Sequence, residues 1–202
     1  GLELARFNQY RPETVPDGPL RIVWNHRWEY DKRPSVFFGA LDRLAEEGIQ
    51  FEIIVLGQNF QQQPNEFLKA KERLRTHIRH FGYTKDFAEY ATLLWLSDVQ
   101  VSCAIQDYFG ASTCEAIFCD CTPILPNRLN YPAFIPDEAQ ALCLYENYEG
   151  LVERLRWAAN NVDFIRSHSL RHHVQGYDWR YLIDRYDQTL QRVVETKISN
   201  SY

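Results

Sequence analysis

Short runs of β-branched and apolar residues alternate with amphipathic segments along most of this 202-residue chain. Such alternation is typical of βαβ units wound around a parallel sheet. The runs predict strands at residues 20–25, 51–57, 78–82, 98–103, 122–125 and 141–144. The segments between them predict helices at residues 34–48, 64–77, 86–96 and 112–119, and the chain from Tyr148 onward is predicted to be helical. We therefore expect an α/β fold, a Rossmann-like doubly wound parallel sheet with a helical C-terminal third.

Right-handed crossovers and the doubly wound strand order 3-2-1-4-5-6 would place the first and fourth strands side by side. In such sheets ligands bind beyond the carboxyl ends of the strands. The first strand leads to Arg27 and Lys32, and the fourth leads to the loop that holds Asp107 and Gly110. We therefore expect these two loops to meet at one crevice.

Charge and composition narrow the classes of function. A net charge of −5 argues against a chain whose main task is to coat nucleic acid. The basic run at residues 69–80 is predicted to be a solvated helix face, and an anionic partner for it stays open. No run of 18 apolar residues is present, so we expect no membrane span.

The five cysteines favour a reducing, cytoplasmic setting, because they are odd in number and lie mostly in apolar segments. Cys119 and Cys121 are too close together for a zinc knuckle, and no aspartate-rich motif is present, so no metal cofactor is expected. The absence of GxGxxG, GxxxxGK[ST] and GxSxG motifs argues against the usual dinucleotide enzymes, P-loop NTPases and α/β-hydrolases.

Two carboxylates, Asp107 and Glu115, flank an aromatic-glycine turn eight positions apart. Asp107 is predicted to lie at the mouth of the following helix and Glu115 about one turn inside it. The backbone N–H groups at that helix start, predicted to be unpaired, would suit a phosphate or a sugar oxygen; they are those of Gly110, Ala111, Ser112 and Thr113. A capped helix with a surface glutamate is the alternative.

Arg27 and Lys32 place two positive charges after the first strand. A guanidinium can hold two phosphate oxygens at once, and a lysine adds a compact charge. The alternative is that these cations pair with Glu29 and Asp31, which local sequence alone favours.

Several motifs together resemble those of the retaining, family 4 glycosyltransferases of GT-B fold. Arg27 and Lys32 match the R-x4-K motif, and Asp107 and Glu115 match E-x7-E with Asp in place of the first Glu. EAIFCDCTP is similar to the EAMACG-x-P of that family, with Asp120 where Gly is common and where an Asp tolerates the left-handed conformation that ends a helix. Within the family, WNHRWEYDKRP is most similar to the tRNA-queuosine mannosyltransferases.

The resemblance implies a role for each matching position. Arg27 and Lys32 would neutralise the leaving diphosphate of a nucleotide sugar, and Glu115 would hold the ribose hydroxyls. Asp107 and the amides of Phe109, Gly110 and Ala111, next to Ser112, would face the donor sugar. Tyr83 and Thr84 would lie beside the base. His26 has no family role and is expected to be structural.

The resemblance also implies how the chain is organised. Residues 1–19 would be an interdomain linker, 20–177 the nucleotide-sugar-binding domain, and 178–202 a helix that returns to an N-terminal acceptor domain outside this chain. The whole protein would transfer a hexose, mannose from GDP-mannose, to an acceptor such as queuosine in tRNA. This chain alone would bind nucleotide and transfer nothing. A GT-B-like binding module without transferase activity, or an epimerase or phosphorylase of the same fold, stays open.

Overall fold

The computed structural model describes residues 1–57 and 65–199 and contains one six-stranded parallel sheet. The strand order is β3-β2-β1-β4-β5-β6, which confirms the predicted doubly wound order. The strands are β1 (Leu20–Asn25), β2 (Phe51–Leu56), β3 (Ile78–Gly82), β4 (Val99–Val101), β5 (Thr122–Pro126) and β6 (Leu144–Tyr145).

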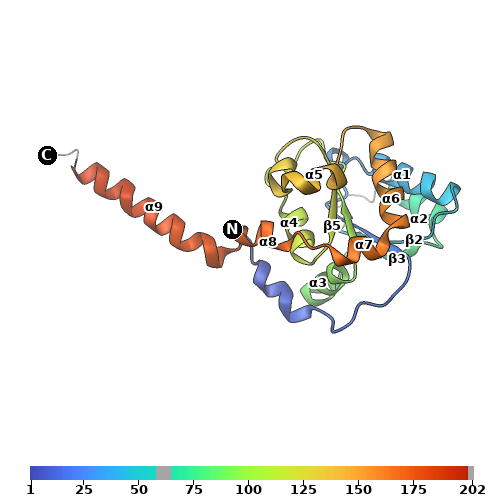
Figure 1. Ribbon diagram of the computed structural model, residues 1–202, viewed down its shortest axis with the longest axis horizontal. Coiled ribbons are helices and arrows are strands. Elements are labelled where there is room, and N and C mark those ends of the chain that lie inside the picture. Colours follow the sequence, from blue (N-terminus) through green and yellow to red (C-terminus); the bar gives the residue numbers. More distant parts are fainter. Residues whose placement is uncertain (58–64, 200–202) are drawn as a thin grey trace.

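Helices cover both faces of this sheet (Figure 1). They are α1 (Pro34–Glu46), α2 (Asn65–Arg73), α3 (Phe87–Trp95), α4 (Ala111–Phe118), α5 (Asp137–Cys143), α6 (Tyr148–Asn160), α7 (Val162–Ser167), α8 (Arg171–Val174) and α9 (Trp179–Ser199). Short 3-10 helices lie at η1 (Leu4–Tyr10), η2 (Tyr30–Lys32), η3 (Tyr131–Phe134) and η4 (Gln175–Tyr177).

The central strand β1 is buried along its whole length, as expected of a parallel strand with helices on both faces. Ile22 and Trp24 belong to one buried cluster with residues of α1, α2 and α6. Val23, between them in sequence, belongs to a second cluster with residues of α3 and α4. Successive side chains of a strand point to opposite faces, so β1 packs into both hydrophobic cores. This packing fixes the position of its carboxyl end.

Beyond shifts of one or two residues at the ends of other elements, two predicted elements differ from the structure. Residues 141–143, predicted as part of a strand, are helical, because Pro136 and the acidic pair Asp137 and Glu138 provide a helix start; only Leu144–Tyr145 pairs with β5. Helix α2 ends at Arg73 rather than at residue 77, because the His77 carbonyl must accept a hydrogen bond from Ile53 in the sheet. Pro64, predicted to begin this helix, lies outside the described residues.

The helical C-terminal third is confirmed, divided into α6, α7, α8 and α9. The segment predicted as a linker packs on the body of the protein, since Leu4 and Phe7 are buried in the second cluster. Leu2 forms backbone hydrogen bonds with Tyr177 and Trp179, so the first residues lie against the start of α9. From there α9 extends away from the sheet (Figure 1).

Local chemistry agrees with the sequence at two further points. Asp120 has a φ of 66°, which confirms the left-handed helix end. Its carboxylate bonds Arg11 and Ser169. All five cysteines are buried and unbridged.

Across residues 1–57 and 65–199 we find no helix with the length and apolar character that crossing a membrane requires.

Candidate functional site

Two adjoining cavities, of about 400 and 420 Å³, lie at the carboxyl edge of the sheet. Both are lined by Asn25, His26 and Arg27, which follow one another at the end of β1. The first cavity extends toward the end of β3, and the second toward the start of α4. Volumes of this size are ordinary for small-molecule sites. We call the first the base-side cavity, because it is lined by Tyr83 and Thr84, which the family resemblance predicts to lie beside a base, and the second the helix-side cavity, because it reaches the start of α4.

The loops after β1 and β4 meet at the helix-side cavity, as the strand order predicted. The Ile105 amide donates to the Asp31 carbonyl at 2.8 Å, and Lys32 Nζ donates to the Gln106 carbonyl at 2.7 Å. Gly57, at the end of β2, has a φ of 103°, and a Cβ there would lie 2.5 Å from the His26 carbonyl oxygen. A glycine at this position therefore lets the β1 loop pass close to β2.

The structure brings both predicted cations, Arg27 and Lys32, to the helix-side cavity, where they differ in exposure and in their ion-pair partners. The Arg27 side chain is 60% exposed and pairs with Glu29 at 3.1 Å. Lys32 is only 9% exposed and lies 3.3 Å from Asp31 and 3.6 Å from Asp107. The pairing partners that local sequence suggested are thus present, and they lie in the same cavity as the cations.

The Asp107 carboxylate accepts two hydrogen bonds that hold its own loop in place. Its Oδ1 accepts a hydrogen bond from the Gly110 N–H at 2.9 Å, and its Oδ2 accepts one from the Tyr131 hydroxyl at 3.1 Å. The prediction that the Gly110 N–H is unpaired is therefore wrong, because a short aspartate side chain reaches the amide three residues on. Gly110 has a φ of 88°, and a Cβ there would lie 2.8 Å from the Phe134 ring.

The amides of Ala111, Ser112 and Thr113 form the first turn of α4, where N–H groups have no partner within the helix. Ala111 and Ser112 line the helix-side cavity. Phe109 packs edge-on against Phe134 and Tyr177, so its ring holds the loop in place.

Glu115 lies one turn inside α4, as predicted, but lines neither cavity. Its Oε2 accepts a hydrogen bond from the Tyr90 hydroxyl at 2.7 Å, and Tyr90 does line the base-side cavity. Burial raises the pKa of Glu115, and the Tyr90 hydrogen bond opposes that rise. No sequence pattern singles out Tyr90, since within α3 it resembles any other apolar-face aromatic.

His26 separates the two cavities and is buried. One ring nitrogen contacts the Val101 carbonyl and the other contacts Ser112 Oγ, each at 3.2 Å. Burial, aided by the charge of Lys32, lowers the pKa of His26 to about 4. A neutral ring then donates to Val101 and accepts from Ser112, which fits the expected structural role.

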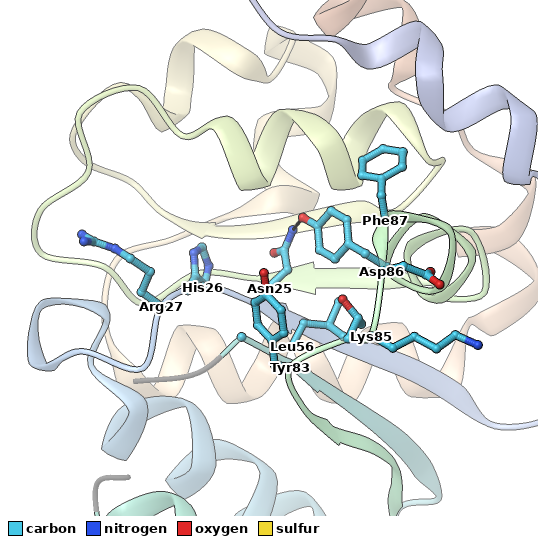
Figure 2. A pocket seen from close by; sticks show the side chains of 11 residues that line it. Asn25, His26, Arg27, Leu56, Tyr83, Lys85, Asp86 and Phe87 are labelled. Carbon is cyan, nitrogen blue, oxygen red and sulfur yellow. Dashed lines mark hydrogen bonds between the residues drawn. The ribbon is translucent and has the colours of Figure 1, made fainter. Parts of the chain in front are cut away.

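Tyr83 and Thr84, predicted to lie beside a base, both line the base-side cavity. Tyr83 is exposed and Thr84 is buried. Figure 2 shows Asn25, His26 and Arg27 one after another at the end of β1, among the side chains that line this cavity. Arg27 and Lys85 extend in opposite directions from this cavity (Figure 2). In the described parts of the chain, no three His, Cys, Asp or Glu side chains gather as a metal site would require.

Sequence comparison relates the chain to known proteins. Residues 6–174 match the family model described as glycosyl transferases group 1. Over 143 residues the chain is 34% identical to the tRNA-queuosine alpha-mannosyltransferase of Drosophila melanogaster. That alignment covers 71% of this chain, which spans 37% of the length of the Drosophila protein.

Solved structures share the fold at low sequence identity. Sucrose-phosphate synthase from Thermosynechococcus elongatus aligns with a TM-score of 0.74 at 15% identity, over 95% of this chain and 48% of its own. The C-terminal domain of a group 1 family glycosyl transferase from Francisella tularensis aligns with a TM-score of 0.68, also at 15% identity. The alignment covers 88% of this chain and 99% of the Francisella domain.

Proposed function

The chain belongs to the glycosyl transferases group 1 family, and we propose that it is the donor-binding part of a retaining glycosyltransferase of GT-B fold. The observation that carries the proposal is the pair of adjoining cavities joined by Asn25, His26 and Arg27. A nucleoside diphosphate sugar has a base and a sugar at opposite ends of an anionic centre. The two cavities offer room for both ends on either side of Arg27.

In this proposal Tyr83 and Thr84 flank the base, and Glu115, which the Tyr90 hydrogen bond links to the wall of the base-side cavity, binds the ribose hydroxyls. Arg27 leaves Glu29 to bind the diphosphate, and Lys32 adds charge from the cavity wall. Exchanging one carboxylate partner for a more highly charged diphosphate is favourable for an exposed guanidinium. The sugar lies at the helix-side cavity, near Asp107 and the first amides of α4.

The chemistry that follows needs no nucleophilic carboxylate. The bond between the anomeric carbon and the diphosphate oxygen breaks, and an acceptor hydroxyl adds to the same face of the sugar. The proton of that hydroxyl passes to the leaving diphosphate. Negative charge grows on the diphosphate as the bond breaks, so fixed cations at Arg27 and Lys32 lower the barrier.

We propose mannose from GDP-mannose as the donor and queuosine in tRNA as the acceptor of the whole protein. This part of the proposal rests on the likeness to the Drosophila queuosine mannosyltransferase. The chain alone would supply the donor half of the cleft. We expect it to bind GDP with a Kd of roughly 10 μM to 1 mM and to transfer nothing.

Isothermal titration of the folded chain with GDP, UDP and ADP tests the proposal. We expect GDP to bind most tightly and GDP-mannose to bind at least as well as GDP. A folded chain that binds none of the three contradicts the proposal, while a preference for UDP or ADP contradicts only the choice of base.

A second candidate is a GT-B-like binding module without transferase activity. The pairing of Arg27 with Glu29 and of Lys32 with Asp31 favours it, because these acids offset the positive charge that transfer would need as negative charge grows on the leaving diphosphate. The whole protein distinguishes the two candidates: it would bind GDP-mannose in either case, but a binding module would transfer no mannose to tRNA.

A further inference from the structure

A line of hydrogen-bonded polar side chains, two of them buried and two half-buried, runs from the middle of the sheet to Glu115. Gln100, fully buried in β4, donates to Asn25 Oδ1 at 3.3 Å. Asn25 Nδ2 in turn lies 3.3 Å from the Tyr90 hydroxyl, which lies 2.7 Å from Glu115 Oε2. These residues come from β4, β1, α3 and α4, so the line ties four elements together at the base-side cavity.

The partners determine the direction of each hydrogen bond. Asn25 Nδ2 lies 2.7 Å from the Ser112 carbonyl, so this atom must be the amide nitrogen rather than the oxygen. Its second N–H then donates to the Tyr90 oxygen. Tyr90 has one hydroxyl proton, which is therefore directed at Glu115.

The protonation states preserve this arrangement. Burial and the nearby Glu115 carboxylate raise the pKa of Tyr90 well above its usual value, so its hydroxyl keeps its proton at neutral pH. Burial raises the pKa of Glu115, and the Tyr90 hydroxyl is the group that favours its ionised form. Tyr90 thus keeps one carboxylate oxygen occupied and helps the other to remain a charged acceptor.

A carboxylate held in this way suits a pair of neighbouring hydroxyls. A freely rotating glutamate loses rotamer entropy when it binds a diol, whereas one held by Tyr90 has already lost it. The side chains that do the holding, Asn25 and Tyr90, line the base-side cavity themselves. Figure 2 shows Asn25 beside His26 at the end of β1, facing this cavity.

We propose that Asn25 and Tyr90 are positioning residues that orient Glu115, so that the site selects a ribonucleotide over a deoxyribonucleotide. The inference rests on the proposed function, because it takes a nucleoside diphosphate as the ligand of this cavity. It adds that the preference for ribose depends on residues of three elements acting as one unit. Tyr90 acts through Glu115 rather than by a separate contact with the ligand.

The test compares GDP with 2′-deoxy-GDP by isothermal titration on the folded chain. We expect the unaltered chain to bind GDP about tenfold more tightly than 2′-deoxy-GDP. Tyr90→Phe removes one hydroxyl and retains the ring. It should weaken GDP binding about fivefold and change 2′-deoxy-GDP binding by less than about twofold.

A double-mutant cycle separates positioning from direct contact. Glu115→Gln keeps the size of the side chain and an oxygen that accepts from Tyr90. If Tyr90 acts through Glu115, adding Tyr90→Phe to Glu115→Gln should weaken GDP binding no further. Because Tyr90→Phe leaves buried polar groups unpaired, circular dichroism must first show that each variant is folded. The matched control is Tyr181→Phe, which removes the hydroxyl of an exposed tyrosine in α9 that lines neither cavity and should leave the binding of both nucleotides unchanged.

The outcomes are distinguishable. No nucleotide binding by the unaltered chain overturns both the proposed function and this inference. Equal binding of GDP and 2′-deoxy-GDP overturns the assignment of Glu115 to the ribose, and the inference with it. A ribose preference that survives Tyr90→Phe, or additive losses in the cycle, overturns the inference alone. If Tyr90→Phe does not fold, Asn25→Ser replaces it in the same comparison, and an unchanged ratio there overturns the inference.

Discussion

Asp107 Oδ1 lies 2.9 Å from the Gly110 amide nitrogen and accepts its hydrogen bond. The same carboxylate lies 3.6 Å from Lys32 Nζ, so one side chain shapes the loop before α4 and holds it against the loop after β1. A glutamate at this position would carry its carboxylate one methylene farther. The aspartate therefore has a structural task at a position where the family motif suggests a sugar contact.

Asp107→Ala should destabilise the protein by about 1–2 kcal/mol, because the Gly110 N–H and the Tyr131 hydroxyl both lose their acceptor. Asp107→Asn retains a carbonyl oxygen for Gly110 and should lose less than half as much. Urea unfolding at pH 7 measures both values. Equal losses for the two variants would mean that the negative charge beside Lys32, rather than the loop hydrogen bond, is the main contribution.

Arg27→Ala and Lys32→Ala should separate binding from stability. Arg27 is largely exposed, so its loss should cost less than about 1 kcal/mol of unfolding free energy. It should weaken GDP binding roughly tenfold or more, because a charge-assisted hydrogen bond is lost. Lys32 is buried between Asp31 and Asp107, and its removal should cost about 2–3 kcal/mol, because it leaves those carboxylates without their cation.

Urea unfolding and titration with GDP check both variants. Arg73→Ala is the matched control, since Arg73 is about half exposed, pairs with Asp42, and lines neither cavity. Arg73→Ala should lower the free energy of unfolding by less than about 1 kcal/mol and should leave GDP binding unchanged. A large stability loss for Arg27→Ala would favour a structural role for the Arg27–Glu29 pair.

Glu115→Gln should stabilise the protein at pH 7 while it weakens nucleotide binding. Burial raises the pKa of Glu115 above its unfolded value, so the folded state binds the proton more tightly. Stability contributed by this group is then present at low pH and is lost as the pH rises through the folded pKa. The variant has no charge to bury, so its Tm should exceed that of the unaltered chain at pH 7 and approach it at pH 4. Thermal unfolding from pH 4 to 8 provides the test, and a Tm difference that does not change with pH would contradict it.

His26 should make stability fall in mild acid. Burial and Lys32 lower its pKa to about 4, while Asp107 and Asp31 act in the opposite direction. Above pH 6.5 the ring is neutral in both folded and unfolded states; below it, the unfolded chain takes up the proton first. A shift from 6.5 to about 4 corresponds to a loss on the order of 3 kcal/mol by pH 4.

His26→Gln removes this titration and should flatten the stability profile between pH 6.5 and 4, although it lowers stability at pH 7. Urea unfolding at pH 7, 5.5 and 4.5 compares the two chains. Parallel profiles would show that His26 is not the group that titrates.

The sheet and the place of the crevice followed from the sequence. Apolar alternation indicates the strands, and the handedness of βαβ crossovers limits their order, so the sequence predicts Arg27 and Asp107 at one edge of the sheet. The strand prediction is wrong for residues 141–143, because a short apolar run fits either structure and the helix start at Pro136 with its two following acids decides for helix.

What the sequence determined by itself is therefore the arrangement of elements and the loops that meet, since these depend on local periodicity and chain connectivity. Only the tertiary structure decided which side chains engage each other there. It paired Gly110 with Asp107, and it placed Tyr90 on Glu115 and His26 in a buried setting beside Lys32. Such pairings require contact distances that are correct to a few tenths of an ångström. They join residues far apart in the chain, such as Asn25 and Ser112, which are 87 positions apart, and no local pattern encodes them.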